Sequence, residues 1–441
     1  MKGKQIHSYI TNAGISELNG LQKQALEINE KQQDVILYAP TGSGKTLAFL
    51  LPMLLNLKEN IEGIQLLILS PTRELALQID AVLKSLKSNF TSLVMYGGHS
   101  FSNERNSLMG KPSVLIGTPG RIVDHIQKQT VDLSQTSYVI LDEFDKILEM
   151  GFHVEMEKIM NELKGVRKKF LVSATPNFEV PSFMKMLNPY RFGIEKVELA
   201  SKLKTFEILF DDPSEKMDVL KDLICQECHD ITIIFCNHRE AVERVSFFLQ
   251  DNGILNSLYH GGLDQDERER ALVKFRNGSV QYLVTTDLGS RGLDVEDVKH
   301  VIHYQLPTTE DVFIHRNGRT ARMNKSGHSY IMKSRDQLLP DFFNSNAEIL
   351  QVKITTEEQV PYPTEWLTLY VGAGKKDKVN KVDIVGFLGQ KGKLSKGDIG
   401  LIHVLDKTAF VAVKRSKVKS VLKLIQNERI KGKKVKIAVS R

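Results

Sequence analysis

The sequence predicts two consecutive α/β units with parallel sheets, followed by a small α+β domain of a different kind. Three observations lead to this fold class. The 441 residues are too many for one ordinary domain of about 150 residues. Up to about residue 350, a short apolar run, a turn and an amphipathic stretch repeat. From residue 363 the pattern changes to short alternating strands and lysine-rich stretches.

Short apolar runs mark the strands of both predicted units. Leucine-rich and β-branched runs suit strands buried on both faces, and the helical intervals between them indicate parallel pairing. In the first unit, expected at residues 1–200, the runs are 35–39, 66–70, 93–96, 114–118, 139–142 and 170–173. In the second unit, expected at 201–350, they are 207–210, 231–236, 258–260, 282–286, 301–304 and 329–332.

The C-terminal residues 363–441 follow another order of elements. After a predicted linker at 351–362, a βαββαβ order is expected, which is typical of the ferredoxin-like, RRM-type fold. We expect the second helix of this domain to be capped by Ser416. The strands are expected at 366–371, 399–405, 408–414 and 435–439, and the helices at 378–389 and 417–427.

Positive charge is concentrated in this last domain. Residues 363–441 carry 19 Lys and Arg against 6 Asp and Glu, a net charge of +13, whereas the whole chain carries +7. The asymmetry favours a polyanion-binding attachment, with nucleic acid as the first partner and an acidic membrane surface as the second. A lysine-rich surface that serves only solubility is the alternative.

The composition excludes several classes of protein. With 41% hydrophobic and 26% charged residues, the chain is neither largely disordered nor collagen-like. No apolar run approaches the roughly 18 residues of a transmembrane helix. The N-terminal stretch lacks the apolar segment of a signal peptide, and three cysteines cannot form a disulfide framework. We therefore expect a cytoplasmic protein.

A glycine-rich loop follows the first apolar run and precedes an apolar helix that we expect to begin near Leu47. Glycines let backbone N–H groups surround phosphate oxygens, and the helix N-terminus adds positive potential. Lys45 would reach the β- and γ-phosphates, and the Thr46 hydroxyl would bind Mg²⁺. The predicted ATP-binding residues of the loop are Thr41, Gly42, Ser43, Gly44, Lys45 and Thr46.

An acidic tetrad, Asp142-Glu143-Phe144-Asp145, follows the apolar run 138–141. Ligands bind at the carboxyl ends of strands in α/β folds, so these acids are expected to face the phosphate loop. Asp142 suits Mg²⁺ coordination, and Glu143 suits activation of the water that attacks the γ-phosphate. A helix-capping acidic cluster is the alternative.

In this combination the chain resembles the DEAD-box ATP-dependent RNA helicases, which implies two tandem RecA-like domains. Gln22, in GISELNGLQ, resembles the Q motif that recognises adenine, and the loop and tetrad resemble motifs I and II. Further motifs of the first unit are 71–76 (PTRELA), 97–98 (GG), 118–121 (TPGR) and 173–175 (SAT). Those of the second unit are 234–237 (IFCN), 285–287 (TTD), 290–294 (SRGLD) and 315–322 (HRNGRTAR).

The resemblance implies a role for each group of motifs. Asp294 would accept hydrogen bonds from the ribose hydroxyls. Arg319 and Arg322, three residues apart and on one face if this stretch is helical, would act as arginine fingers, so that hydrolysis needs both units. The family is thought to bend one RNA strand and so open a short duplex. Contacts to the RNA backbone, which carry no sequence code, are expected from Pro71, Thr72, Arg73, Gly98, Thr118, Arg121 and Thr286.

The motifs depart from the family pattern at a few positions. Phe144 stands where the family has Ala, so the neighbours of this larger ring must be repacked. Ala321 replaces a usual Gly, and Leu18 replaces a usual Pro. The family's adenine-stacking aromatic upstream of the Q motif is not expected at its usual spacing.

Outside these motifs, the residues Cys225-Gln226-Glu227-Cys228-His229 match the pattern of a c-type haem attachment sequence. Because it lies in an apolar-periodic helix, we interpret the cysteines as core residues, and haem or zinc as the alternative.

The C-terminal domain resembles the RNA-binding domain of DbpA-type DEAD-box proteins, which grip a hairpin of large-subunit ribosomal RNA. The resemblance rests on 372–378 (GAGKKDK), 383–386 (DIVG) and 399–400 (IG). Lys375 and Lys376 are expected to bind RNA, and Phe410 is the one residue of the third strand expected to stack on a base. A basic dimerisation or stability module is the alternative.

We therefore predict an RNA-dependent ATPase and ATP-dependent RNA helicase that remodels ribosomal RNA during large-subunit assembly. Its expected cofactors are ATP and Mg²⁺, and its expected partner is structured RNA, with neither membrane nor DNA. A general helicase for mRNA or RNA decay, and an ATP-gated RNA clamp that does not unwind, remain as alternatives. A DNA translocase is disfavoured by Gln22 and by the RRM-like domain.

Overall fold

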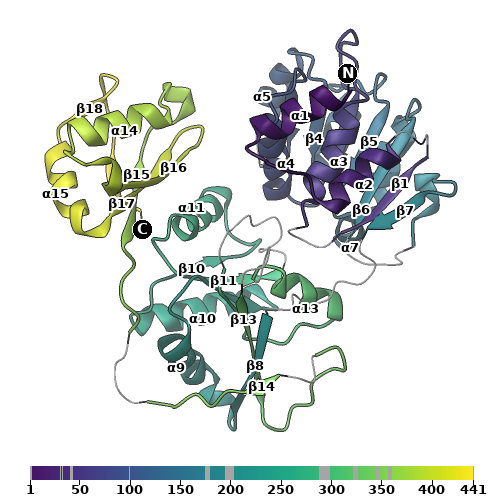
Figure 1. Cartoon of the computed structure of the whole chain (residues 1–441). Coiled ribbons are helices and arrows are strands. Elements are labelled where there is room, and N and C mark those ends of the chain that lie inside the picture. The colour runs from purple at the N-terminus through teal and green to yellow at the C-terminus, as the bar shows by residue number, and fades with distance from the viewer. Residues whose placement is uncertain are drawn as a thin grey trace. The chain divides into compact units, whose positions relative to one another are not determined.

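The fold is given by a computed structural model (Figure 1). It forms two compact units, of which the second includes the C-terminal domain. No helix of the described chain is long and apolar enough to cross a lipid bilayer. The structure describes residues 2–29, 31, 33–39, 43–98, 100–173, 179–193, 203–287, 298–320, 326–343, 347–355 and 360–440.

The first unit is built on a parallel sheet. Its strands are β1 (Val35–Tyr38), β2 (Leu66–Leu69), β3 (Ser92–Met95), β4 (Val114–Gly117), β5 (Tyr138–Leu141), β6 (Lys168–Ser173) and β7 (Tyr190–Gly193). They lie in the order β3-β4-β2-β5-β6-β1-β7, and every pairing is parallel. Val35 and Leu37 enter one core and Ile36 and Tyr38 the other, as expected for strands covered on both faces.

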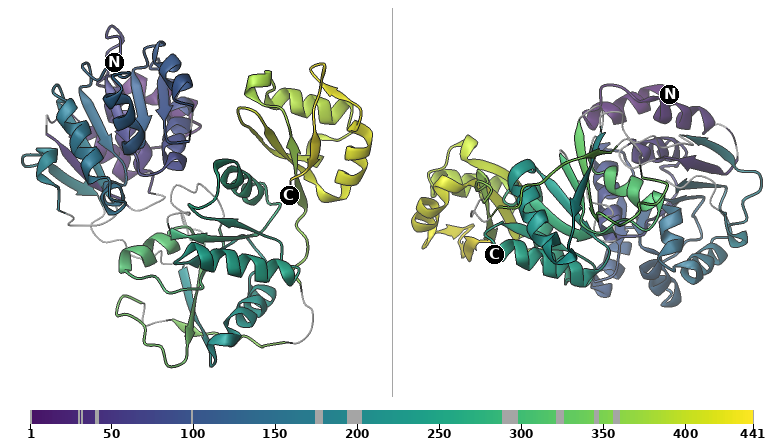
Figure 2. Two further views of the ribbon diagram at one scale, coloured as in Figure 1. Left: turned by 180° about the vertical axis from the view of Figure 1, so that it is seen from behind. Right: turned by 90° about the horizontal axis from the view of Figure 1, so that it is seen from below.

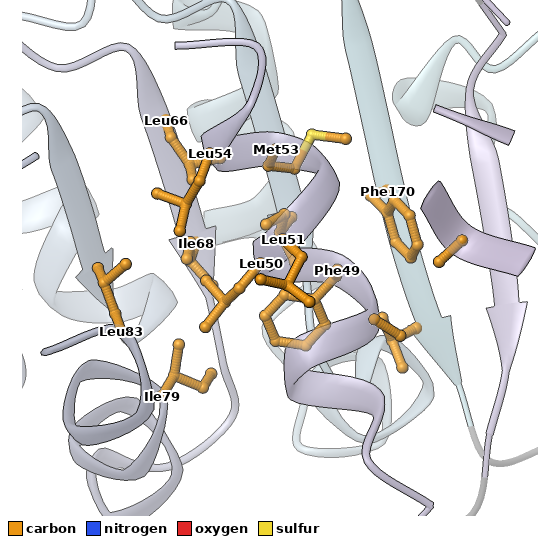
Figure 3. Close-up of a cluster of buried hydrophobic side chains, with 14 of the residues drawn as sticks. Phe49, Leu50, Leu51, Met53, Leu54, Leu66, Ile68, Ile79, Leu83 and Phe170 are labelled. Carbon is orange, nitrogen blue, oxygen red and sulfur yellow. The ribbon is translucent and has the colours of Figure 1, made fainter. Parts of the chain in front are cut away.

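Helices cover both faces of this sheet (Figures 1 and 2). On one face lie α1 (Lys2–Asn12), α2 (Gly20–Ile28), α3 (Lys45–Leu54) and α4 (Arg73–Ser85). Phe49 of α3 meets Phe170 edge to face, with ring centroids 6.5 Å apart, in the core shown in Figure 3. Against the other core pack α6 (Pro119–Gln127), α7 (Phe144–Glu149) and α8 (His153–Glu162), with α5 (Phe101–Leu108) at its edge.

The second unit contains another parallel sheet, in the order β10-β11-β9-β12-β13-β8-β14. Its strands are β8 (Leu203–Phe210), β9 (Thr232–Cys236), β10 (Asn256–Tyr259), β11 (Tyr282–Thr286), β12 (His300–His303), β13 (Gly327–Ser334) and β14 (Glu348–Ile349). Cys228 lies in its core, as predicted, and so does Cys236, whereas Cys225 is only half-buried. The helices are α9 (Lys216–Glu227), α10 (Arg239–Asp251), α11 (Gln265–Arg276) and α13 (Glu310–Asn317).

The C-terminal domain has the predicted βαββαβ order, with an antiparallel sheet in the order β16-β17-β15-β20. Its elements are β15 (Trp366–Val371), α14 (Lys381–Gln390), β16 (Ile399–Val404), β17 (Ala409–Lys414), α15 (Arg415–Ile425) and β20 (Ile437–Val439). A short hairpin of β18 (Arg429–Ile430) and β19 (Lys433–Lys434) precedes the last strand. Leu369, Val371 and Val411 face the helices and form the core.

Polar contacts tie this domain to the segment between α11 and β11. Thr368 Oγ1 lies 2.6 Å from Ser279 Oγ and accepts a 3.3 Å hydrogen bond from Asn277 Nδ2, just after α11. Upstream, the amide side chain of Gln226 on α9 exchanges two hydrogen bonds with the backbone of Lys353. The predicted linker is therefore held against the second unit at Lys353.

Three details of the predicted elements are wrong. Ser416 lies inside α15, whose N-cap is Lys414, so its hydroxyl does not cap the helix. The helix expected from residue 378 begins at Lys381, where Asn380 forms a capping box. The phosphate-loop helix begins at Lys45 rather than near Leu47, because Gly44 in the left-handed conformation is its N-cap. The edge strands β7 and β14 were not predicted.

Candidate functional site

Strand order sorts the predicted site residues of the first unit into two neighbouring groups. Strands β5, β6 and β1 are adjacent, and Asp142, Ser173 and the phosphate loop lie at their carboxyl ends. Strands β3, β4 and β2 are also adjacent, and Gly98, Thr118 and the segment 70–73 follow them. One half of the sheet edge therefore carries the motifs expected to bind nucleotide, and the other half carries the motifs expected to bind RNA.

Lys45 joins the phosphate loop to the acidic tetrad. Its Nζ lies 3.3 Å from Glu143 Oε1 and 3.4 Å from Asp142 Oδ1. Burial lowers the pKa of Lys45, but the attraction of Asp142, Glu143 and Asp145 outweighs burial and raises the pKa overall. Burial raises the pKa of Asp142 to about 6, against the opposing effect of Lys45. The lysine is thus a permanent cation held by two acids.

The acidic pair has the features of a metal and water site. Glu143 adopts the left-handed conformation at φ 49°, which is strained for a residue with a side chain, and its N–H donates to Asp142 Oδ1. Within the described part of the chain, the other oxygen of Asp142 is buried without a hydrogen-bond partner. A buried, unsatisfied carboxylate oxygen beside a phosphate loop fits Mg²⁺ or a water bound to it. Thr46, on the first turn of α3, is partly exposed.

Gln22 contacts the phosphate loop directly. Its Nε2 donates to the carbonyl of Gly44 at 3.2 Å, while its Oε1 accepts from the N–H of Asn19. A Cβ added to Gly44 would lie 2.5 Å from this amide, so glycine is required there. Asn19, which was not predicted as a site residue, donates from Nδ2 to the carbonyl of Ser43 at 2.9 Å. The signal was present, because Asn19 and Gln22 form a capping box.

Phe144, the departure within the tetrad, is fully buried in one core of the first unit, beside Ile147. Thr41 and Gly42 of the loop lie outside the described residues, as do Ala174 and Thr175.

The second half of the edge brings together the predicted RNA-binding motifs. A Cβ on Gly98, which has φ +90°, would lie 2.8 Å from Arg73 Nη1, so these two motifs are in close contact. Thr72 caps α4 with its hydroxyl, and Pro71 before it is buried. Thr118 makes no capping hydrogen bond to α6. Arg121, in the first turn of α6, forms a 2.6 Å ion pair with Glu104. Glu104 was not predicted as a site residue.

In the second unit, Arg316, which was not predicted as a site residue, is buried and makes several hydrogen bonds. Arg316 is 1% exposed and binds Asp287 through Nε and Nη2, at 2.6 and 2.8 Å. It also donates to Asn237 Oδ1 and to the carbonyl of Gln305. These partners follow β11, β9 and β12, which are neighbours in the sheet. Arg316 therefore joins its own motif, 315–322, to the motifs at 234–237 and 285–287 and to the loop after β12.

The predicted arginine fingers are only partly described. Arg319 is buried and lies beyond the end of α13, which stops at Asn317, so the expected helical stretch does not include it. Arg322 and Asp294 lie outside the described residues. Thr286, the last residue of β11, is buried.

In the C-terminal domain the predicted lysines and the predicted stacking ring differ in accessibility. Lys375 and Lys376 are exposed on the turn after β15. The Phe410 ring is 4% exposed and lies edge to face with Tyr370, at 5.8 Å between centroids. A base cannot stack on a ring that is covered in this way, so the arrangement argues against the expectation for Phe410.

Comparison with family models assigns all three parts of the chain. Residues 19–183 match the DEAD/DEAH box helicase model, and residues 215–324 match the helicase conserved C-terminal domain. Residues 368–439 match the DbpA RNA-binding domain. An ATP-dependent RNA helicase DbpA of Bacillus subtilis is 31% identical over 96% of this chain and 95% of its own. The chain belongs to the DEAD-box ATP-dependent RNA helicases.

This helicase is of the DbpA type and is an RNA-dependent ATPase. The DbpA of Escherichia coli is also 31% identical, over 96% of this chain and 94% of the relative. A structure of Mss116p bound to single-stranded RNA and AMP-PNP has 26% identity and a TM-score of 0.70, covering 80% of this chain and 78% of that one. Dbp5 of S. cerevisiae, at 24% identity and a TM-score of 0.69 over 79% of this chain and 93% of that one, shares the fold. The predicted family and the RecA-like and RRM-like folds are thus confirmed.

Proposed function

We propose that the first unit hydrolyses ATP through the residues gathered at β1, β5 and β6. Gln22 would recognise adenine, Lys45 and the loop would hold the phosphates, and Glu143 would activate the attacking water. Asp142 and Thr46 would hold Mg²⁺, which neutralises charge on the phosphate oxygens when it is bound. The unsatisfied oxygen of Asp142 supports this assignment.

The contacts of Lys45 suggest how the site becomes active. The Lys45 ammonium is paired with both Asp142 and Glu143. Phosphates that attract Lys45 would free Glu143 from this ion pair. Glu143 would then accept a proton from the attacking water, and its strained backbone would keep its carboxylate at the end of β5.

RNA would bind along β3, β4 and β2 through Arg73, Thr118 and Arg121, without reading sequence. We propose that Arg319 and Arg322 of the second unit complete catalysis in the RNA-bound state, which would link hydrolysis to local opening of a duplex.

The C-terminal domain would choose the RNA. We propose that it holds structured ribosomal RNA, and that the helicase remodels this RNA during large-subunit assembly in the cytoplasm. The proposal rests on one observation: the DbpA RNA-binding model covers 368–439, the part of the chain with net charge +13. Tethering to one hairpin raises the local concentration of neighbouring duplexes without new contacts from the helicase units.

The test compares a hairpin of large-subunit ribosomal RNA with a scrambled hairpin of equal length as activators of ATP hydrolysis by the full chain. A lower half-maximal concentration for the ribosomal hairpin supports the proposal. Lys375→Ala with Lys376→Ala should remove this preference, whereas the control Lys158→Ala with Lys164→Ala on the first unit should keep it. Equal activation by both hairpins would reduce the domain to a general basic anchor.

A further inference from the structure

One buried acid in the first unit has no part in the ATP site. Glu104 is 3% exposed and is the only buried residue of α5, whose place in the first unit is seen in Figure 1, while Phe101 and Leu108 at its ends are half-buried. A buried carboxylate is costly unless it is paired and hydrogen-bonded.

The partners of Glu104 come from the strand end and helix expected to bind RNA. Its Oε2 accepts from Arg121 Nε at 2.6 Å and from His125 Nε2 at 3.0 Å, both on α6. Its Oε1 accepts from the N–H of Tyr96, directly after β3. One carboxylate therefore connects the segments that precede Gly97-Gly98 and follow Thr118.

Arg121 is also held from the side. Its guanidinium carbon lies 5.1 Å from the centre of the Phe101 ring. That ring stacks on His125 at 4.1 Å with an interplanar angle of 12°. The His125 Nδ1 in turn lies 2.8 Å from Thr130 Oγ1. The arginine side chain is 10% exposed, so these contacts restrict its orientation.

We propose that Glu104 is a positioning residue for RNA binding, which holds the Arg121 guanidinium in the orientation that meets an RNA phosphate. The inference rests on the RNA-binding role proposed for Arg121. The guanidinium group of arginine is planar. Glu104 accepts the hydrogen bond of the Arg121 Nε–H, which fixes the orientation of this plane. Because the side chain is already ordered, the RNA does not bear the cost of ordering it.

Charge alone predicts the opposite effect. Glu104 is a negative group close to a bound phosphate, so neutralising it should strengthen RNA binding if it acts only through its charge. Asp124 provides a matched control, because its Oδ2 lies 3.7 Å from Arg121 Nη1 on a side chain that is 51% exposed. It carries the same charge at the same arginine without a buried, close hydrogen bond.

The experiment uses the full chain with Glu104→Gln, Asp124→Asn, Arg121→Ala and the double variant Glu104→Gln with Arg121→Ala. It measures the concentration of an unstructured RNA 12-mer that gives half-maximal ATP hydrolysis, the rate at saturating RNA, and the affinity for nucleotide without RNA. We expect Glu104→Gln to raise the RNA concentration about threefold to tenfold, since a neutral amide makes weaker hydrogen bonds to Arg121. The saturated rate and the nucleotide affinity should stay within about twofold. Asp124→Asn should leave the RNA concentration unchanged or lower it.

The double variant separates positioning from general damage. If Glu104 acts through Arg121, Glu104→Gln has no further effect in the Arg121→Ala background. Unchanged or tighter RNA binding by Glu104→Gln, additive losses in the double variant, or a loss of nucleotide affinity would each overturn the inference. If Arg121→Ala itself leaves RNA binding unchanged, the RNA-binding role of Arg121 fails first, and the inference falls with it.

Discussion

Lys45 Nζ lies 3.3 Å from Glu143 Oε1, and both side chains are less than a tenth exposed. The two residues are 98 positions apart in sequence and meet because β1 and β5 both flank β6 in the sheet. The pair brings the cation proposed to bind phosphate into direct contact with the proposed base.

We predict that Lys45→Ala abolishes ATP hydrolysis, because the phosphates lose a charged partner. The change also leaves Asp142 and Glu143 buried without their cation, so the first unit should lose roughly 3 kcal/mol of stability. Hydrolysis assays and urea unfolding of the variant check both effects. Hydrolysis by this variant at the wild-type rate would contradict the assignment of Lys45 to the ATP site.

Asn19 offers a more selective change. Asn19→Thr keeps an N-cap for α2 but removes the amide that donates to the Ser43 carbonyl. The KM for ATP should therefore rise by a few fold, which corresponds to the loss of about one hydrogen bond. Asn19→Ala should lose the cap as well and cost about 1 kcal/mol of stability. An unchanged KM for ATP in Asn19→Thr would show that the contact does not matter for nucleotide binding.

The junction between α11 and the C-terminal domain should behave as a buried hydrogen-bonded pair. Thr368→Val leaves the Ser279 hydroxyl without its partner and should destabilise the second unit by about 1–3 kcal/mol, whereas Ser279→Ala with Thr368→Val should recover part of this loss. Trp366 is the single tryptophan of the chain and begins β15, so its fluorescence during urea unfolding reports on this region. A double variant that loses the sum of both single effects would contradict the prediction.

Histidines in the second sheet should make this unit sensitive to acid. Burial, together with the nearby charge of Arg316, lowers the pKa of His303 to about 3. Burial, together with the neighbouring His328, lowers the pKa of His300 to about 4. In the unfolded chain both would bind protons below pH 6.5 or so. The unfolded state therefore binds more protons, and stability falls as the pH drops from about 6.5 towards 4, by up to about 1.4 kcal/mol per histidine and pH unit.

The replacement His303→Gln tests this pH dependence, because glutamine does not titrate. Unfolding followed by Trp366 fluorescence between pH 7.5 and 4.5 should show a shallower loss of stability in the variant. Equal slopes for the two proteins would show that His303 does not contribute.

Most of the fold could be predicted from sequence because the strands are buried on both faces. The run 35–39 is continuously apolar, and the run 282–286 combines apolar residues with β-branched threonines, as expected for parallel strands buried on both faces. The strand β7 (Tyr190–Gly193) was missed, since an edge strand with Arg191 and Gly193 lacks such a run. Ser416 was misplaced because a serine near the start of a helix fits both an N-cap and a first-turn position.

Residues whose motif carries its own chemistry could be predicted to lie together from sequence, as the 3.4 Å distance between Lys45 Nζ and Asp142 Oδ1 shows, while their roles stay predictions. Glu104 and Arg316 could not be predicted from local sequence, because their roles depend on partners from separate strands and helices. The burial of the Phe410 ring could not be predicted from the sequence either, because it depends on how the ring packs in the folded chain.

The most direct test of the central claim measures ATP hydrolysis by the full chain and by Glu143→Gln, with and without structured RNA after ribonuclease treatment. We predict a rate close to background without RNA, a strong increase with RNA, and no increase with DNA of the same sequence. Glu143→Gln should bind ATP and retain RNA in a stable complex, but should hydrolyse ATP at least about a hundredfold more slowly. Full hydrolysis without RNA, or turnover by Glu143→Gln at the wild-type rate, would contradict an RNA-dependent ATPase that uses Glu143 as its base.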